Sequence, residues 1–342
     1  MSKHVSVYCS ETATLNEDVF AKVCKEESIE HDRTVAMLPY GAANVIGSES
    51  RWYYFDRALA SDSLFALDDS LRPVTEAGNP YSGLRRTRIF SFGSCNMACP
   101  YCKRDCQFCD AHGRPIVAVD VPISDLFLLA ETAVERTEIV RFSGGDPVMY
   151  ARQCLAIAKY LWHVHHTKVS VAHNGSAPSW IERMLPYLDS VAVDVKATPD
   201  KAGRIMGLSQ RAGAHFISRS IESIRTCCEH ENDVLVDVRT PLFGDTTLED
   251  LVWIGEQIFH THSRKLFWTI RLYSPAPHCD FTQPSLKNAI EMIRSLSEII
   301  PNAWIGVRGR WHNSPMLFIK NGRILNDDAQ HLDDVPTSGN RL

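Results

Sequence analysis

Three cysteines close together constrain this chain more than any other feature. They lie in the segment Cys95-Asn-Met-Ala-Cys99-Pro-Tyr-Cys102, directly after the apolar run at 89–93. Thiolates are preferred ligands of iron–sulfur clusters and of other soft metals. Three thiolates around a four-iron cluster leave one iron without a protein ligand. We therefore expect this segment to hold a cluster with one open position.

Two further cysteines leave alternatives open. Cys106 and Cys109 form a second Cys-x2-Cys pair after Cys99 and Cys102, and two such pairs are a common ligand set for structural zinc. Zinc sites normally separate their pairs by about a dozen residues, whereas three residues separate these. The same two cysteines also repeat the spacing in an overlapping frame that begins at Cys102. We favour the first frame because it directly follows a predicted strand. Cys106 and Cys109 are left as structural thiols or as ligands of an auxiliary cluster.

Composition restricts the class of protein. Of 342 residues, 44% are hydrophobic and 23% are charged, which is typical of a globular protein. The net charge of −5 gives no indication of a nucleic acid or an anionic membrane as partner. No apolar run is long enough for a membrane span, and the N-terminus lacks a signal-peptide core. Five of the eleven cysteines lie between Cys95 and Cys109, which favours a reducing compartment, the cytoplasm.

An alternation of strand and helix patterns begins near residue 86. Segments rich in Val, Ile and Phe predict six strands, at 88–93, 139–143, 168–172, 190–195, 234–239 and 266–273. Helical patterns lie between them, at 123–135, 151–163, 178–188, from about 217 to 228, and 248–260. Several strands are short apolar runs, as expected for strands buried on both faces. Such an alternation predicts a parallel α/β fold with functional loops after the strands. Periodicity alone does not separate an incomplete barrel from an open doubly wound sheet.

Segments on either side of this alternation predict two additions. Strand-like runs at 51–59 and 63–67 predict a hairpin, so we expect residues 1–85 to form a mixed or β N-terminal extension. The last part contains a helix at 284–299, strands at 303–308 and 316–319, and a tight turn at Asn321-Gly322. The predicted division is 1–85, a core at 86–280, and a small C-terminal extension at 281–342.

Polar motifs follow three neighbouring predicted strands. Phe142-Ser-Gly-Gly-Asp-Pro147 ends the second strand, His173-Asn-Gly-Ser176 follows the third, and Asp194-Val-Lys196 follows the fourth. A Gly-Gly pair lets the backbone approach a ligand closely. Each motif alone is also an ordinary turn or strand end. Their position at successive strand ends is what favours a binding site.

Together, the cysteine segment and these motifs resemble those of the radical SAM superfamily. The resemblance implies a partial (β/α)6 TIM-like barrel and a [4Fe–4S] cluster held by Cys95, Cys99 and Cys102, with S-adenosyl-L-methionine (SAM) at the open iron. The family's usual Gly-Gly-Glu-Pro motif, in which Asp146 replaces Glu, binds the methionyl amino group. The implied SAM-binding residues are Tyr101 against the adenine, Ser143, Gly144, Gly145, Asp146, Asn174, Asp194, Lys196, and Arg239 at the carboxylate or ribose.

The same resemblance implies a reaction. A 5′-deoxyadenosyl radical formed by reductive cleavage of SAM takes a hydrogen atom from substrate, and a flavodoxin- or ferredoxin-type protein supplies the electron. The motif layout is closest to the activases of glycyl-radical enzymes, so an activase acting on a partner protein is one alternative. A non-catalytic zinc or iron–sulfur binding protein is an alternative of another class.

Three departures from the activase pattern favour a small-molecule or peptide substrate. Ala172 and His173 replace an Asp-Thr pair, no ferredoxin-like insertion follows Cys109, and 94 residues precede Cys95. Arg271 and Tyr273, at the end of the sixth predicted strand, are candidates for substrate contact. No catalytic side chain is predicted.

Overall fold

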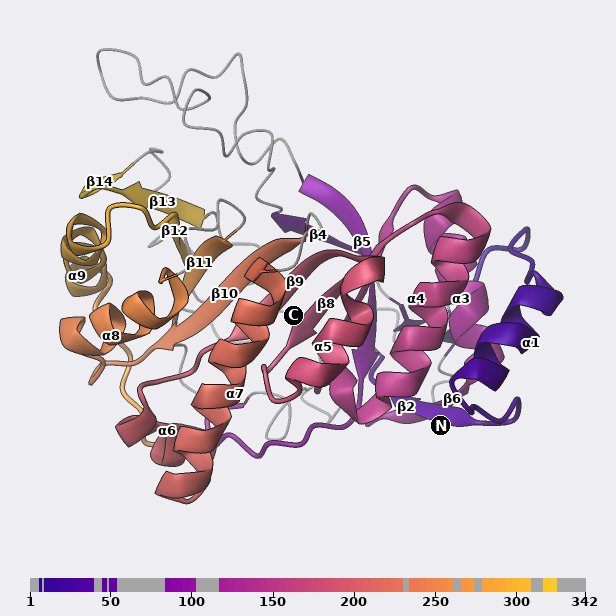
Figure 1. Ribbon diagram of the computed structural model, residues 1–342, viewed down its shortest axis with the longest axis horizontal. Coiled ribbons are helices and arrows are strands. Elements are labelled where there is room, and N and C mark those ends of the chain that lie inside the picture. Colours follow the sequence, from indigo (N-terminus) through magenta and orange to yellow (C-terminus); the bar gives the residue numbers. More distant parts are fainter. Residues whose placement is uncertain are drawn as a thin grey trace, which may run out of the picture.

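One continuous sheet organises the computed structural model, which describes residues 6–7, 9–39, 45–47, 49–53, 84–102, 117–229, 234–260, 266–273, 279–308 and 316–324 (Figure 1). Its strands are β2 (Thr34–Met37), β4 (Glu49–Tyr53), β5 (Leu84–Phe92), β6 (Val119–Pro122), β7 (Ile139–Gly144), β8 (Val169–His173), β9 (Leu188–Asp194), β10 (Leu235–Leu242), β11 (Leu266–Leu272), β12 (Ile305–Arg308), β13 (Met316–Lys320) and β14 (Arg323–Ile324). Two short strands, β1 (Ser6–Val7) and β3 (Val45–Ile46), pair separately.

The centre of the sheet is parallel and follows chain order. Strands β5, β7, β8, β9, β10, β11 and β12 lie side by side and parallel. Antiparallel strands flank them, with β2 and β4 beside β5 and with β13 beside β12. Among the described residues the sheet therefore does not close on itself. The strand order never reverses, as it would in a doubly wound sheet. The fold is the expected partial TIM-like barrel.

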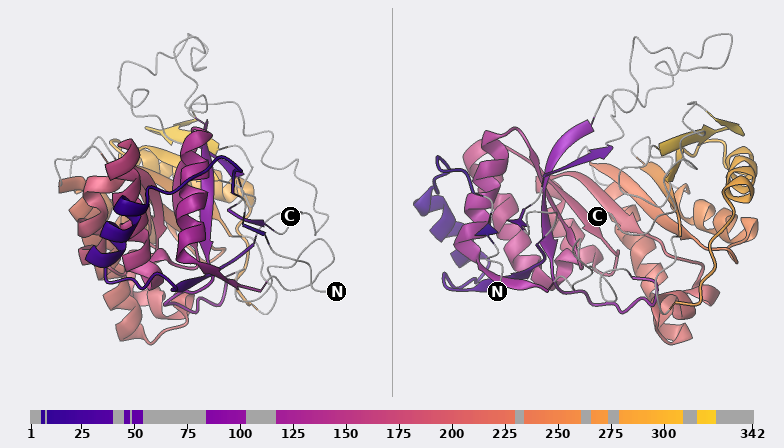
Figure 2. Two further views of the ribbon diagram at one scale, coloured as in Figure 1. Left: turned by 90° about the vertical axis from the view of Figure 1, so that its right-hand side faces the viewer. Right: turned by 180° about the vertical axis from the view of Figure 1, so that it is seen from behind.

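Helices cover one side of this sheet. They are α1 (Glu17–Glu26), α3 (Ile123–Glu135), α4 (Ala151–His165), α5 (Pro178–Met184), α6 (Pro199–Met206), α7 (Gln210–Glu229), α8 (Leu248–Ile258) and α9 (Leu286–Ile299), with short 3-10 turns η2 (Pro147–Tyr150) and η3 (Leu185–Tyr187). Figure 1 shows α4, α5 and α7 in front of the strands, with α1 beyond α4 and α6 below, and Figure 2 gives the side and rear views. Contacts join α3 to α4, α4 to α5, α5 to α7 and α7 to α8, so these helices form one row.

The two faces of the parallel strands differ in polarity. Residues paired in register share a face of the sheet. One row across five neighbouring strands is wholly apolar and buried: Phe90, Phe142, Val171, Val191 and Val236. A row on the opposite face contains Asp194, Arg239 and Thr269. Both faces are largely buried, as expected, but one of them, called below the polar face, carries charged groups.

Most predicted elements are confirmed to within a few residues, and several differences are informative. The strand expected at 303–308 forms β12, which continues the parallel sheet as a seventh strand. The predicted hairpin at 51–67 overlaps β4, which pairs with β5 instead, and its remainder lies outside the described residues. The turn at Asn321 and Gly322 joins β13 to β14 with positive φ at both residues. The division into 1–85, 86–280 and 281–342 stays a prediction. Within the described part of the chain, no helix has the length and apolar character needed to cross a membrane.

Candidate functional site

The cysteine loop follows β5 and is fastened to the end of β7. Gly145 donates a backbone hydrogen bond to the carbonyl of Phe92 at 2.7 Å, and Asp146 donates one to the carbonyl of Ser94 at 2.8 Å. Within the loop, the N–H of Cys102 donates to the carbonyl of Cys99 at 2.9 Å, closing a turn. These bonds bring the Gly-Gly-Asp motif against the start of the loop.

Two glycines allow this close approach. Gly144 has a φ of +97°, and a Cβ at this position would meet the backbone of Phe92. Gly207, just after α6, has a φ of +66°, and a Cβ there would lie 2.8 Å from the carbonyl oxygen of Ala98. Only glycine adopts such φ values without strain. The loop is therefore held between the end of β7 and the end of α6.

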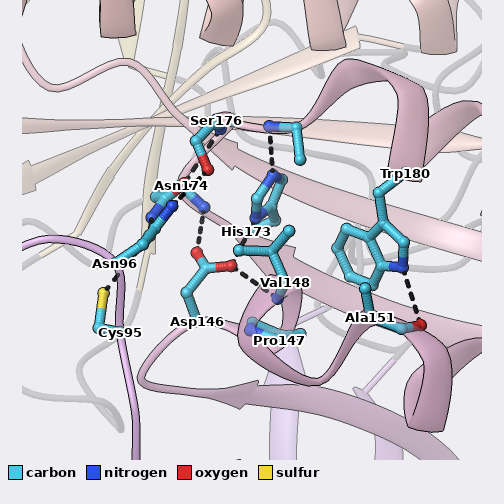
Figure 3. A network of polar contacts seen from close by, with 12 residues as sticks. Cys95, Asn96, Asp146, Pro147, Val148, Ala151, His173, Asn174, Ser176 and Trp180 are labelled. Carbon is cyan, nitrogen blue, oxygen red and sulfur yellow. Dashed lines mark hydrogen bonds and ion pairs between the residues drawn. The ribbon is translucent and has the colours of Figure 1, made fainter.

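Asp146 joins the ends of β7 and β8 through three hydrogen bonds (Figure 3). Its Oδ1 accepts from the N–H of Val148 at 2.9 Å and lies 2.7 Å from Nδ1 of His173, while its Oδ2 accepts from the N–H of Asn174 at 2.7 Å. The N–H of Ala177 donates to Nε2 of His173, so Nδ1 carries the ring proton and donates to Asp146. The Asp146 carboxylate thus positions the backbone around it.

Asn96, between the first two cysteines, extends this network to the cysteine loop. Its Oδ1 accepts from Nδ2 of Asn174 at 2.6 Å, and its Nδ2 donates to Oγ of Ser176 at 2.9 Å. The N–H of Ser176 in turn donates to Oδ1 of Asn174 at 3.0 Å. Figure 3 shows these amides lying between Cys95 and Asp146. We refer to Asp146, His173, Asn174, Asn96 and Ser176 as the Asp146 network.

A second group of predicted residues gathers at the ends of β9 and β10. Nζ of Lys196 lies 2.6 Å from Oδ2 of Asp194, and the same ammonium lies 5.9 Å from the ring centre of Tyr101. Burial alone would raise the pKa of Asp194, but Lys196, with smaller contributions from Arg239 and Arg271, holds it below the ordinary value. Burial likewise opposes the charge of Lys196, yet Asp194 raises its pKa well above the ordinary value. Both side chains are therefore charged at neutral pH.

Arg239 is oriented by a residue that the sequence analysis did not select. Asp237 accepts from Nε of Arg239 at 2.7 Å and from Oγ1 of Thr269 at 2.6 Å. The signal was present in the sequence, because residues two apart on a strand share a face. Asn96 was missed for a different reason. It lies between two cysteines of the motif, where the motif specifies no residue type, and only the folded loop places it in contact with Asn174.

Tyr101 lies among aromatic side chains contributed by distant parts of the chain. Its ring meets those of Phe243, Tyr273 and Phe281 edge-on, with centroids 5.2, 6.5 and 6.3 Å apart. Burial raises the pKa of its hydroxyl, which is therefore neutral at physiological pH. These rings form an apolar wall beside Lys196.

The three cysteines offer a donor set that suits an iron–sulfur cluster. All three are partly buried. Burial raises the pKa of Cys99 to about 11, Lys196 opposes this rise, and Cys102 and Cys95 add to it, so the three thiols lie close enough to interact. Among the described residues, no three His, Cys, Asp or Glu side chains gather around a point that would hold one metal ion. In a four-iron cluster each thiolate binds a different iron. The donor chemistry fits such a cluster, and Cys106 and Cys109, which a zinc site needs, lie outside the described residues.

Most of the predicted site residues lie at or beyond the carboxyl ends of parallel strands, where such folds carry function, whereas Arg239 lies within β10. Two groups are brought together: Asp146 with Asn174 in one, and Cys99, Tyr101, Asp194, Lys196 and Arg239 in the other. Asn96 links the cysteine loop to the first group, and Cys99 belongs to the second. Ser143 and Gly144 end β7 in register with Ser91 and Phe92 of β5.

Comparison with known proteins gives one family. Residues 90–257, from β5 to α8, match the family model described as the Radical SAM superfamily. No curated protein matched the chain. Among solved structures, a radical SAM methyltransferase from Sphaerobacter thermophilus is similar, with a TM-score of 0.47 and 15% sequence identity, covering 67% of this chain and 68% of that chain. At this level of similarity, nothing about the reaction of the present chain is inferred from that protein.

Proposed function

Because the chain belongs to the radical SAM superfamily, whose members use a [4Fe–4S] cluster and SAM, we propose that it is an enzyme that takes a hydrogen atom from a small-molecule or peptide substrate. Cys95, Cys99 and Cys102 would hold the cluster. When bound, the cluster and SAM supply a 5′-deoxyadenosyl radical by reductive cleavage. A flavodoxin- or ferredoxin-type donor in a reducing compartment, the cytoplasm, would provide the electron.

One observation carries this proposal: the cysteine loop is bonded directly to two of the three strand-end motifs implied for SAM. Asn96 reaches Asn174, and Asn174 reaches Asp146. Cofactor sites in parallel α/β folds form where the loops after several strands converge. The Asp146 network would hold the Gly144–Gly145 backbone in place for the methionyl amino group.

The charged residues on the other side would orient the remainder of SAM. Lys196 and Asp194 neutralise each other, so each keeps its charge although it is partly buried. Asp237 fixes the guanidinium of Arg239 through Nε. The rings around Tyr101 would exclude water from the adenine and from the reacting atoms.

His173 supports a modifying enzyme over an activase. The activase pattern has an Asp-Thr pair where this chain has Ala172 and His173, and that pair is associated with a cation site. Both ring nitrogens of His173 are already engaged, one with Asp146 and the other with the N–H of Ala177. His173 therefore offers no free nitrogen to a cation.

The first prediction tests the cluster assignment. After anaerobic reconstitution, the full-length protein is expected to bind about four iron atoms per chain and to form 5′-deoxyadenosine from SAM with dithionite. Cys95→Ala, Cys99→Ala and Cys102→Ala each remove one thiolate, and each should lose both properties. Cys9→Ala, at an exposed thiol, is the matched control and should keep both.

Two outcomes would contradict this assignment. One is 5′-deoxyadenosine formation that survives substitution of any of the three cysteines. The other is a purified protein that contains about one zinc and no iron, which would favour the non-catalytic alternative.

A further inference from the structure

Arg271, near the end of β11, places a positive charge on the polar face of the sheet. It lies two residues beyond Thr269, so both side chains are on the face that carries Arg239 and Asp237. Asp194, Asp237, Arg239 and Tyr101 are near enough to influence its charge. Burial, followed by repulsion from Arg239, lowers the pKa of Arg271 to about 10, so the guanidinium remains charged at neutral pH.

The neighbouring charges are already matched to each other. Asp194 pairs with Lys196 at 2.6 Å, and Asp237 pairs with Arg239 at 2.7 Å. With these two pairs formed, Arg271 is the surplus cation among the described residues of this group. Its Nε and Nη2 are buried, and among the described residues neither has a hydrogen-bond partner. A buried guanidinium whose donors are unpaired is costly unless a bound molecule satisfies it.

The positions of Nε and Nη2 in the guanidinium of Arg271 indicate the shape of a group that would bind them. Nε and Nη2 lie along one edge of the planar guanidinium, and their N–H groups point the same way. This edge matches the two oxygens of a carboxylate, which it binds through two parallel hydrogen bonds. We propose that Arg271 binds a carboxylate group of the substrate through this edge. The proposal rests on the proposed function, since it names the substrate class of the same site.

Position in the sheet favours the substrate over SAM as the source of this carboxylate. The cysteine loop and the implied SAM motifs follow or lie on β5, β7, β8, β9 and β10. Arg271 lies beyond them on β11, which pairs with β10 on one side and β12 on the other. If SAM binds against β5 to β10, it does not occupy Arg271. Arg271 is then available to a substrate that binds beside β11.

The second prediction measures carboxylate binding without requiring turnover. Thermal unfolding of the reconstituted full-length protein is followed with succinate, with its neutral analogue succinamide, and with inorganic phosphate, all at constant ionic strength. Succinate should raise the Tm saturably, whereas succinamide and phosphate should not. Arg271→Gln should weaken the apparent affinity for succinate by about tenfold or more, because it removes the charge and the two-donor edge. Arg271→Lys keeps the charge alone and should be intermediate.

Two controls separate this site from general effects. Arg183→Gln makes the same change on α5, where the side chain is 56% exposed, and should respond to succinate as the wild type does. In a second arm, the Tm shift caused by SAM is measured in Arg271→Gln, and it should persist because the proposal assigns Arg271 to the substrate and not to SAM.

Several results would overturn the proposal. They are an equal succinate response in wild type and Arg271→Gln, an equal response to succinate and succinamide, a stronger response to phosphate, and no response in wild type. Loss of SAM binding in Arg271→Gln would also overturn it, because Arg271 would then serve the carboxylate of SAM. If Arg271→Gln fails to fold, the comparison of Arg271→Lys with wild type decides. If the wild type forms no 5′-deoxyadenosine, the proposed function fails while the succinate arm still tests Arg271.

Discussion

At the scale of single residues, Asp146 positions more of its neighbours than its motif indicates. Its side chain is buried, and it accepts hydrogen bonds from two backbone N–H groups and from His173. The family motif has Glu at this position, and the implied contact with SAM is made largely by backbone. In this chain, the shorter carboxylate accepts from the N–H groups of Val148 and Asn174, beside the Gly-Gly turn. Asp146 therefore acts as a positioning residue.

The third prediction follows from this role. Asp146→Ala would leave three buried donors without an acceptor, at about 1–3 kcal/mol each before relaxation. We expect it to lower the free energy of unfolding by roughly 3–5 kcal/mol and to reduce 5′-deoxyadenosine formation, because the Gly144–Gly145 backbone would lose its support. Urea unfolding measures the first effect. Asp120→Ala, at an exposed position on β6, is the control, and a loss as small as that of Asp120→Ala would contradict the role assigned to Asp146.

Candidate site residues were predicted from the sequence where their chemistry alone indicates them, and their roles stay predictions. Thiolate spacing indicated Cys95, Cys99 and Cys102, and strand ends indicated Asp194 and Lys196. Hydrogen-bond partners were not readable, because they depend on how separate loops meet. The hydrogen bond between Asn96 and Asn174 joins residues 78 positions apart, and no local sequence pattern predicts it.

At the scale of elements, the helical patterns between strands predicted α3, α4, α5, α7 and α8, whereas α6 was not predicted. The helix predicted at 123–135 coincides with α3, in which Ile123, Leu126, Phe127 and Ala130 are buried at helical spacing. The eight residues of α6 were not anticipated, although Pro199 begins it and Gly207 follows it. Proline at the first position and glycine just past the end are the usual helix boundaries. The start of α8 is fixed by a capping box formed by Thr247 and Asp250.

The fourth prediction concerns the contact between α6 and the cysteine loop. Gly207→Ala introduces strain at a φ of +66° and places a Cβ against the carbonyl of Ala98. Gly322→Ala in the distant β13–β14 turn introduces similar strain at a φ of +72°, but it meets only the flexible side chain of Glu298. Each should cost about 1–2 kcal/mol of stability. Only Gly207→Ala should also lower the iron content after reconstitution.

This pair of variants separates strain from displacement of the loop. Equal iron content in Gly207→Ala and Gly322→Ala, measured on folded protein, would mean that α6 does not help to hold the cysteine loop. A lower iron content in both would point to general destabilisation instead.

At the scale of the whole molecule, the repeated alternation of strand and helix was sufficient to predict the parallel sheet. Right-handed crossovers leave few other arrangements for such a pattern. The edges were not predictable in the same way. Strand β12 joins the parallel sheet, and β2 pairs with β6 and β5, because of contacts between segments far apart in the chain. The sequence pattern specifies a strand, but it does not specify its neighbours.

The last prediction tests whether the C-terminal part unfolds with the core. Sheet pairing runs without a break from β9 through β10, β11 and β12 to β13. Ile319 in β13 and Val193 in β9 are both buried, so Ile319→Ala and Val193→Ala should each cost about 2–4 kcal/mol. If the sheet is one cooperative unit, both variants lower the Tm of the same transition by several degrees. Calorimetry measures this, with Arg323→Ala, at an exposed position, as control. A separate early transition in Ile319→Ala, with the main transition unchanged, would instead support an independent C-terminal unit beginning near residue 281.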